Sequence, residues 1–411
     1  MLKMLLSHSM PFTEDKMISV EDIKEAYRRI KKFIHKTPLI YSDSFSRLTG
    51  AKVYIKAENL QKTGSFKVRG AFNKLSGMKG KVITVSMGNH AQAVAFAGSK
   101  LGIKTKVIMP VTVPIVKAEA TKGYGATVEL VGENYSQALE YAKTQKDYIF
   151  IHGFDDEKII AGQGTIGLEI MEEIRDIDAL LVPVGGGGLI SGIAVAVKST
   201  LRNVKVLGVQ TKSAISAMLS LERGKIVEFP PRPTIADGIA IGRIGELNFE
   251  IMKKYVDDII AVKEETIAMS ILLFLERKKL VVEGAGAVPL AALLENERRF
   301  GGKNVVLVVS GGNIDFNLID KIIYKGLVQS GRIGVIEAVV EDVPGSLQAL
   351  TEIIAKNKGN ILDVQHDRIS KDLPIGKTKI IFTIEIRNNE HLRKIYSDFK
   401  KERFSARVLT G

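Results

Sequence analysis

The sequence predicts an α/β protein, with a large domain built on parallel sheets followed by a smaller ferredoxin-like domain. From residue 51 to about residue 312, short β-branched runs alternate with helical segments, and from residue 332 the order becomes βαββαβ. The chain has 411 residues, of which 45% are hydrophobic and 26% are charged, as in soluble globular proteins. That length accommodates two or three domains with sizeable cores.

The first predicted element is a helix that begins after Ser19. The stretch Ser19-Val20-Glu21-Asp22 resembles a capping box, in which two side chains satisfy free N–H groups at a helix start. Apolar residues then recur at helical spacing and mark one buried face. They are Val20, Ile23, Tyr27, Ile30 and Ile34.

Apolar, β-branched runs predict the strands of the large domain. Runs this apolar, separated by helices, indicate parallel strands covered on both faces. The predicted strands are Lys81–Val85, Thr105–Met109, Thr127–Val131, Tyr148–Ile151, Leu180–Val184, Val204–Val209, Ile259–Val262 and Val305–Val309.

The composition changes after Asn313, where a connecting helix and a linker are predicted near Asp320–Ser330. We expect a first domain over residues 1–320, a linker over 321–331 and a second domain over 332–411. The second domain has the element order of a ferredoxin-like unit. Its predicted elements are a strand at Ile333–Val340, a helix at Gly345–Lys358, strands near Ile361–Ile369 and Lys377–Ile386, a helix at Asn389–Lys400 and a strand at Phe404–Leu409.

Charge and cysteine content narrow the classes of function. The net charge of +13 raises the question of nucleic acid, but Lys and Arg are dispersed among Asp and Glu without a long basic block, so no nucleic acid is expected. The absence of cysteine excludes disulfides, thiol nucleophiles and cysteine-ligated metals. The six histidines show no metal-ligand spacing.

We expect no membrane segment and a cytoplasmic location. The start, Met1–Ser7, lacks the long apolar stretch of a signal peptide. The uncharged run Ala179–Val197 is long enough to suggest a span, but Pro183 and four consecutive glycines predict a strand, a loop and a helix instead.

Lys67 is the first candidate for chemistry. The stretch Lys62-Thr63-Gly64-Ser65-Phe66-Lys67 follows a β-like run and opens a helix. A helix start carries free N–H groups and a positive dipole end, which disfavours the charge of an ammonium. A neutral amine can act as a nucleophile and form a Schiff base. Taken alone, Lys67 is more simply a solvated lysine at a helix start.

Two further stretches lie between a predicted strand and a helix. Ser86-Met87-Gly88-Asn89-His90 offers a helix start that suits a carboxylate, although an ordinary turn with a capping Asn has the same pattern. Gly185-Gly186-Gly187-Gly188 lets successive N–H groups turn toward one anion without an obstructing Cβ. A glycine-rich loop alone is a weak signal, and this one lacks the Lys-Ser/Thr of a P-loop.

With Ser310-Gly311-Gly312-Asn313, these stretches closely resemble the motifs of the fold type II pyridoxal-phosphate enzymes, specifically the threonine/serine dehydratases. The resemblance implies two lobes, the smaller at about residues 54–160, with the cofactor between them. It also implies that Lys67 carries pyridoxal phosphate, that the glycines hold the phosphate, that Asn89 meets the phenolic oxygen and that Ser310 faces the ring nitrogen. The implied cofactor-binding residues are Lys67, Phe66, Asn89, Gly185, Gly186, Gly187, Gly188, Leu189 and Ser310, and the implied substrate-binding residues are Ser86, Gly88, Asn89 and His90.

The activity implied by this resemblance is that of a threonine ammonia-lyase, with Lys67 as the catalytic residue. The freed Lys67 removes the Cα proton, the β-hydroxyl leaves, and 2-oxobutanoate and ammonia are released; serine would give pyruvate. A serine hydroxyl at Ser310 cannot keep the ring nitrogen protonated as a carboxylate would, which favours elimination over transamination.

Two alternatives stay open from the sequence. One is a serine-preferring dehydratase or racemase, although Met87 stands where related racemases carry a proton-donating serine. The other is a non-catalytic amino-acid sensor with the same fold. The dehydratase–racemase branch that binds a divalent ion has carboxylates where this chain reads Gln210–Ser216, so no metal is expected there.

The C-terminal domain resembles ACT domains, which bind amino acids as regulators. The resemblance rests on the βαββαβ order and on the turn Asp342-Val343-Pro344-Gly345-Ser346-Leu347. It implies allosteric control by an end product such as isoleucine or valine, a role in isoleucine biosynthesis, and a homo-oligomer, dimer or tetramer. A dimerising appendage without a ligand is the alternative.

Overall fold

The computed structural model describes residues 17–371 and 373–410. It divides into two compact units, Met1–Ile314 and Asp315–Gly411. The expectation about a signal peptide at Met1–Ser7 falls outside the described residues. Helix α14 (Phe316–Gln329) belongs to the second unit and occupies the stretch predicted as a connecting helix and linker.

The predicted N-terminal helix and its capping box are confirmed in α1 (Val20–Ile30). The Ser19 side chain accepts a hydrogen bond from the backbone N–H of Asp22, and the Asp22 carboxylate accepts one from the N–H of Ser19. Ile23, Ala26 and Ile30 are buried on the predicted face.

The first unit is built on a six-stranded sheet of order β1-β2-β10-β7-β8-β9. All neighbouring pairs are parallel except β1 with β2, an antiparallel edge pair that the sequence did not predict. Its strands are β1 (Leu39–Tyr41), β2 (Lys52–Ala57), β7 (Ala179–Pro183), β8 (Lys205–Thr211), β9 (Asp258–Val262) and β10 (Asn304–Val309).

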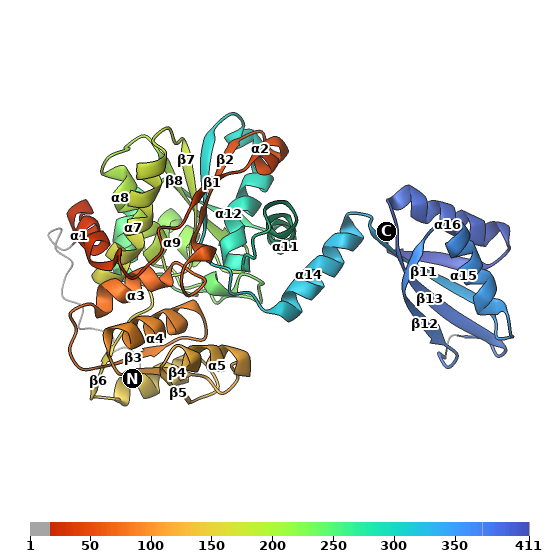
Figure 1. Ribbon diagram of the computed structural model, residues 1–411, viewed down its shortest axis with the longest axis horizontal. Helices are drawn as coiled ribbons and strands as arrows, with labels where there is room; N and C mark the ends of the chain where they lie inside the picture. The colour runs from red at the N-terminus through yellow and green to blue at the C-terminus, as the bar shows by residue number, and fades with distance from the viewer. Residues whose placement is uncertain (1–16, 372, 411) are drawn as a thin grey trace. The chain divides into compact units, whose positions relative to one another are not determined.

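Helices cover both faces of this sheet, as the apolar strands predicted: α7 and α8 lie on one face and α12 on the other (Figure 1). The uncharged run 179–197 forms a buried strand, a glycine loop and a helix, as expected. The helices around this sheet are α2 (Asp43–Thr49), α7 (Glu157–Glu173), α8 (Gly188–Lys198), α9 (Ser216–Arg223), α10 (Glu246–Tyr255), α11 (Glu264–Leu273), α12 (Gly284–Glu295) and α13 (Glu297–Phe300), with short helical turns η2 (Glu58–Leu60), η3 (Asp237–Ile239) and η4 (Phe274–Lys278).

A second, four-stranded parallel sheet of order β5-β4-β3-β6 lies within the range 54–160 expected for a smaller lobe. Its strands are β3 (Lys81–Val85), β4 (Thr105–Met109), β5 (Thr127–Leu130) and β6 (Tyr148–Phe150). Its helices are α3 (Lys67–Leu75), α4 (Asn89–Leu101), α5 (Ile115–Gly123) and α6 (Tyr135–Thr144).

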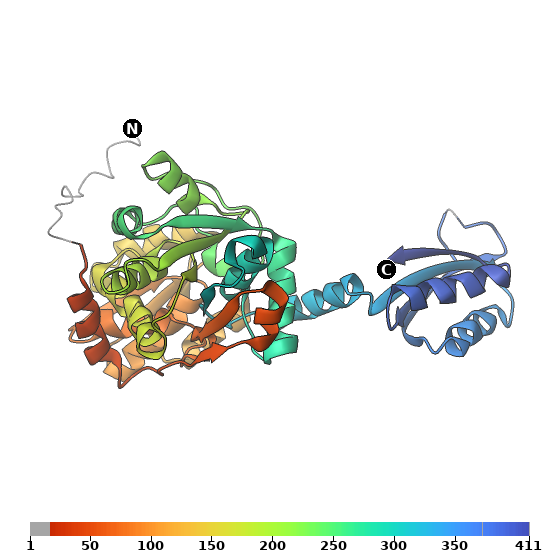
Figure 2. The ribbon, with the colours of Figure 1, turned by 90° about the horizontal axis from the view of Figure 1, so that it is seen from above.

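The second unit confirms the βαββαβ order. Its antiparallel sheet has the order β12-β13-β11-β14, and α15 and α16 cover the same face (Figures 1 and 2). Its elements are β11 (Ile333–Glu341), α15 (Ser346–Lys356), β12 (Asn360–Asp367), β13 (Lys377–Glu385), α16 (Asn389–Lys401) and β14 (Ser405–Thr410). No helix in the described ranges is both long and apolar enough to cross a bilayer.

Candidate functional site

Backbone pairing joins the Lys67 loop to the loop that follows β10. The N–H of Phe66 donates to the carbonyl of Ser310 at 3.0 Å, and the N–H of Gly312 donates to the carbonyl of Gly64 at 2.9 Å. Two motifs that are far apart in the sequence therefore lie side by side, because β2 and β10 are parallel neighbours whose carboxyl ends share one edge.

Lys67 is the first residue of α3, as predicted, and is partly accessible. Its Nζ donates to the carbonyl of Gly153 at 2.9 Å and lies 5.2 Å from the centre of the Phe66 ring. Burial lowers the pKa of the Lys67 amine to about 8, although the charge of Glu283 opposes the shift. An appreciable fraction of the amine is therefore neutral near neutral pH, as a nucleophile or base requires.

The loop after β6, which the sequence did not single out, connects Lys67 to the glycine loop. Gly153 accepts the Lys67 hydrogen bond, and the next residue, Phe154, packs on the glycines. Asp155 accepts hydrogen bonds from the N–H groups of Glu246 and Leu247 at the start of α10. The available signal was the stretch His152-Gly153-Phe154-Asp155, which places a histidine and an aspartate directly after a strand.

The four glycines lie between β7 and α8, where an anion would meet several donors. Among the described residues, none accepts a hydrogen bond from the N–H groups of residues 185–189. Leu189 is buried in the first turn of α8. Free N–H groups at the positive end of a helix suit the phosphate of pyridoxal phosphate.

The glycines are also required by the packing of the protein around the loop. A Cβ at Gly186 would lie 2.3 Å from the Phe154 ring, and one at Gly187 would lie 2.8 Å from Cβ of Asn248. Gly187 has a φ of +99°, a conformation that strongly favours glycine. The missing Cβ atoms at Gly186 and Gly187 therefore also make room for Phe154 and Asn248.

Ser86, Gly88, Asn89 and His90 form the start of α4. The Ser86 hydroxyl accepts from the N–H of Gly88 at 3.2 Å. The His90 ring is buried with Nε2 3.4 Å from the carbonyl of Ile151, and burial, with the charge of Lys67, lowers its pKa to about 3. His90 is thus a neutral, buried side chain whose Nε2 faces a backbone carbonyl.

Glu283, which the sequence reading did not select, lies among these residues. Its carboxylate accepts from Nδ2 of Asn89 at 2.8 Å and 3.0 Å, and the side chain is 4% exposed. Burial raises its pKa to about 7, against the hydrogen bond from Asn89. Ser310, at the end of β10, is 2% exposed.

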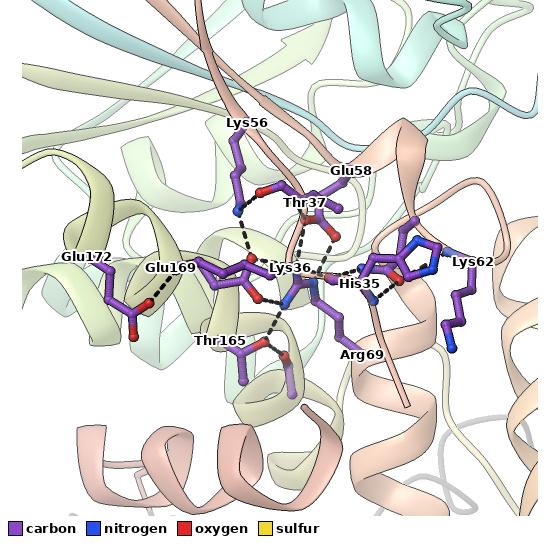
Figure 3. A network of polar contacts seen from close by, with 12 residues as sticks. His35, Lys36, Thr37, Lys56, Glu58, Lys62, Arg69, Thr165, Glu169 and Glu172 are labelled. Atoms are coloured by element: carbon purple, nitrogen blue, oxygen red, sulfur yellow. Dashed lines mark hydrogen bonds and ion pairs between the residues drawn. The ribbon is translucent and has the colours of Figure 1, made fainter. Parts of the chain in front are cut away.

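Two residues beyond Lys67, Arg69 is the centre of a fully buried charge network, which we call the Arg69 network (Figure 3). Its guanidinium donates to Glu58 and Glu169 at 2.7–2.8 Å, and Lys56 Nζ reaches Glu169 at 2.6 Å. The carboxylates raise the pKa of Arg69 despite its burial. The network joins β2, η2, α3 and α7 and thereby fixes the start of α3.

Gln210 is the first residue of the stretch 210–216, where no metal is expected. The Gln210 amide is committed to protein, since it donates to the carbonyl of Val184 at 3.2 Å and accepts from the N–H of Met218 at 3.0 Å. Within residues 17–371 and 373–410, His, Asp and Glu form no group of three or more that could hold a metal ion.

A cavity of about 470 Å³ lies elsewhere, at the amino ends of β7 and β8, and contains none of the candidate residues. It is lined in part by Arg175, Arg202, Lys205, Arg299 and Lys303.

Comparison with known proteins gives a family match within each unit. Residues 30–311 match the family described as pyridoxal-phosphate dependent enzyme, and residues 333–403 match the ACT domain family. The chain is 49% identical to the L-threonine ammonia-lyase of Thermotoga maritima over 387 residues, which cover 92% of this chain and 96% of that protein.

Two solved structures resemble about three quarters of the chain. A threonine deaminase from T.th. is 42% identical, with a TM-score of 0.70, over 73% of this chain and 99% of that one. Maize serine racemase is 34% identical, with a TM-score of 0.71, over 76% of this chain and 98% of that one.

Proposed function

The chain belongs to the pyridoxal-phosphate-dependent enzyme family and carries an ACT domain, and from this premise we propose that it is a threonine ammonia-lyase. It converts L-threonine to 2-oxobutanoate and ammonia with pyridoxal phosphate as cofactor, and L-serine to pyruvate as a second reaction. The observation that carries the proposal is the lowered pKa of Lys67, in a loop whose residues Gly64 and Phe66 pair through their backbones with the Ser310 loop. It is joined by the likeness to L-threonine ammonia-lyase.

The residues of this chain fit the cofactor. The free N–H groups of residues 185–189 can hold its phosphate, the neutral form of Lys67 can bind it covalently, and Asn89 can donate to its phenolic oxygen. When bound, pyridoxal phosphate supplies the electron sink that makes the Cα proton of an amino acid acidic.

The chain's own groups then handle the substrate and the proton. The N–H groups at the start of α4 can bind the substrate carboxylate, since a helix start attracts anions. Nζ of Lys67, with its pKa of about 8, can accept the Cα proton. Ser310 offers the ring nitrogen a hydroxyl and no carboxylate, which favours elimination over transamination.

A serine-preferring dehydratase or racemase is the second candidate, favoured by the likeness to maize serine racemase. Met87, which is 41% exposed beside the start of α4, opposes racemisation. Its thioether has no proton to donate to Cα. The likeness to the T. maritima ammonia-lyase also favours an enzyme over the third candidate, a non-catalytic amino-acid sensor.

An assay of 2-oxo acid release from L-threonine and L-serine tests the activity. We expect both substrates to react, with the larger kcat/KM for L-threonine. A larger kcat/KM for L-serine, or accumulation of D-serine, would select the second candidate. A protein that binds pyridoxal phosphate and turns over neither amino acid would refute both.

We further propose that isoleucine or valine regulates the enzyme through the second unit, in a homo-oligomer of the cytoplasm that serves isoleucine biosynthesis. The turn between β11 and α15 supports this, because Val343 and Leu347 are exposed beside the helix start. Exposed apolar side chains suit a branched side chain, and a helix start suits its carboxylate. Such a ligand changes activity only if it binds two arrangements of the protein unequally.

Truncation tests this regulation. A chain that ends at Ile314 removes the second unit at the boundary between the units, and one that ends at Ser330 retains α14. Both should deaminate threonine without responding to isoleucine or valine. The control is the full-length chain, whose threonine kinetics and thermal stability should change with one of the two. A response in the truncated chains would move the site to the first unit.

A further inference from the structure

Glu283 precedes the first residue of α12, yet its carboxylate does not cap that helix. No side-chain hydrogen bond to the start of α12 is formed, and both carboxylate oxygens instead contact Nδ2 of Asn89. A buried carboxylate that serves only its own helix would satisfy that helix's N–H groups. The contact with Asn89 therefore indicates a role at the start of α4.

The Asn89 side chain is held at both ends, so its orientation is determined. Nδ2 of Asn313 donates to the carbonyl of Thr63 at 2.8 Å and to Oδ1 of Asn89 at 2.8 Å. Because a backbone carbonyl only accepts, Asn313 presents its N–H groups, and Asn89 must present oxygen to Asn313 and nitrogen to Glu283. The two oxygens of the Glu283 carboxylate lie on the same side of Nδ2, so a single N–H can be shared between them. The second N–H of Asn89 is then left for another acceptor.

Close packing holds Glu283 in place. A Cβ on Gly311 would lie 2.3 Å from Oε1 of Glu283, and the backbone N–H of Glu283 donates to the carbonyl of Gly311 at 3.1 Å. The Asn89 side chain has two hydrogen-bond partners, Asn313 and Glu283. The Ser310–Asn313 loop contains the first and packs against the second.

We propose that Glu283 is a positioning residue that orients the Asn89 amide so that an N–H, and never the amide oxygen, faces the phenolic oxygen of pyridoxal phosphate. This inference rests on the proposed function, since it assigns a role in cofactor binding. An amide turned the other way would place oxygen against oxygen and weaken the bound cofactor.

Two substitutions distinguish the role of Glu283 as a hydrogen-bond acceptor from the effect of its charge and from its effect on folding. Glu283→Gln retains an acceptor for Asn89 without the charge, whereas Glu283→Ala removes both. Cofactor affinity is measured by titrating pyridoxal phosphate into protein from which it has been removed, and the spectrum of the bound cofactor is recorded. We expect Glu283→Ala to weaken binding about tenfold, the size of one hydrogen bond, and to shift the spectrum toward the protonated phenol; Glu283→Gln should stay within about threefold.

A double-mutant cycle with Asn89→Ala tests whether Glu283 acts through Asn89. In the Asn89→Ala background, Glu283→Ala should weaken cofactor binding no further. The matched control is Glu295→Gln, at the other end of α12, where Glu295 accepts from the N–H of Lys263 at 3.0 Å. It should leave both affinity and spectrum unchanged.

Additive effects in the cycle, equal losses in the Gln and Ala variants, or unchanged affinity in Glu283→Ala would each overturn the proposal. If Glu283→Ala does not fold, Glu283→Gln decides. Alone, it must keep near-wild-type affinity and spectrum, and added to Asn89→Ala it must change neither relative to Asn89→Ala. Cofactor affinity and spectrum are measured without substrate, so failure of threonine turnover in the wild-type enzyme is a separate outcome.

Discussion

Lys67 and Arg69 are two cations two residues apart at the start of α3, and the protein treats them in opposite ways. Arg69 is fully buried, and Glu58 and Glu169 surround it. Lys67 has one backbone carbonyl as its hydrogen-bond partner, and Glu283 contributes only at longer range. Burial disfavours both charges, yet the pKa of Arg69 is raised and that of Lys67 is lowered to about 8.

The carboxylates show the same contrast. Burial acts to raise the pKa of both Glu58 and Glu283. At Glu58 the charge of Arg69 outweighs burial, so the pKa is lowered. At Glu283 no cation among the described residues outweighs burial, and the pKa is raised to about 7. A buried charge with a full set of partners stabilises one arrangement of the chain, and one without them is free to change its protonation. One helix start therefore has a cation with a full set of charged partners and a cation whose pKa is lowered toward neutrality.

The largest expected effect is on activity at Lys67. Lys67→Ala removes both the anchor of the cofactor and the base, so turnover of threonine should fall by at least about ten-thousand-fold. The absorbance of the covalently bound cofactor should disappear while the circular dichroism spectrum is retained. Substantial elimination activity in this variant would end the assignment of Lys67.

The next largest effect is on stability at Arg69. Arg69→Met leaves Glu58 and Glu169 without their main partner, which should lower the free energy of unfolding by about 3–5 kcal/mol. Urea unfolding of both proteins measures the difference. A loss below about 1 kcal/mol would show that the Arg69 network stabilises the fold no more than an exposed ion pair does.

The same substitution at Lys67 should have the opposite sign. Since the folded pKa of about 8 lies below the ordinary 10.5, the unfolded chain binds more protons between these values. Stability of the cofactor-free protein therefore rises with pH from about 8 to 10.5, and below pH 8 the charged lysine is destabilising. Lys67→Met should stabilise that protein by about 1–3 kcal/mol at pH 7, and the gain should vanish above about pH 10.5. Unfolding across this pH range checks it; a loss of stability at pH 7 would contradict it.

The smallest effect is expected at Lys36, an exposed cation near the Arg69 network (Figure 3). Its ion pair with Glu172 measures 2.8 Å, but the two side chains are 49% and 50% exposed. Water and salt screen such a pair, so Lys36→Met should change the free energy of unfolding by less than about 1 kcal/mol. A loss comparable to that of Arg69→Met would show that this pair is part of the network.

Local patterns in the sequence were enough to predict the order and kind of elements and the place of the glycine loop and Lys67. Apolar runs, turn glycines and the capping residues around Ser19 act over a few neighbouring positions. The predicted strands of both units and the βαββαβ order were recoverable for that reason. The antiparallel edge strand β1 was not, since three residues carry too little pattern to predict a strand.

Which side chains meet was settled by the tertiary fold alone. Glu283 lies 194 positions from Asn89, and Glu169 lies 100 positions from Arg69, so no local spacing distinguishes them from other glutamates. The burial that lowers the pKa of His90 is likewise an effect of tertiary packing that no local pattern predicts. Desolvation and charge pairing depend on packing in three dimensions, and they give Lys67 a lowered pKa and Arg69 a raised one.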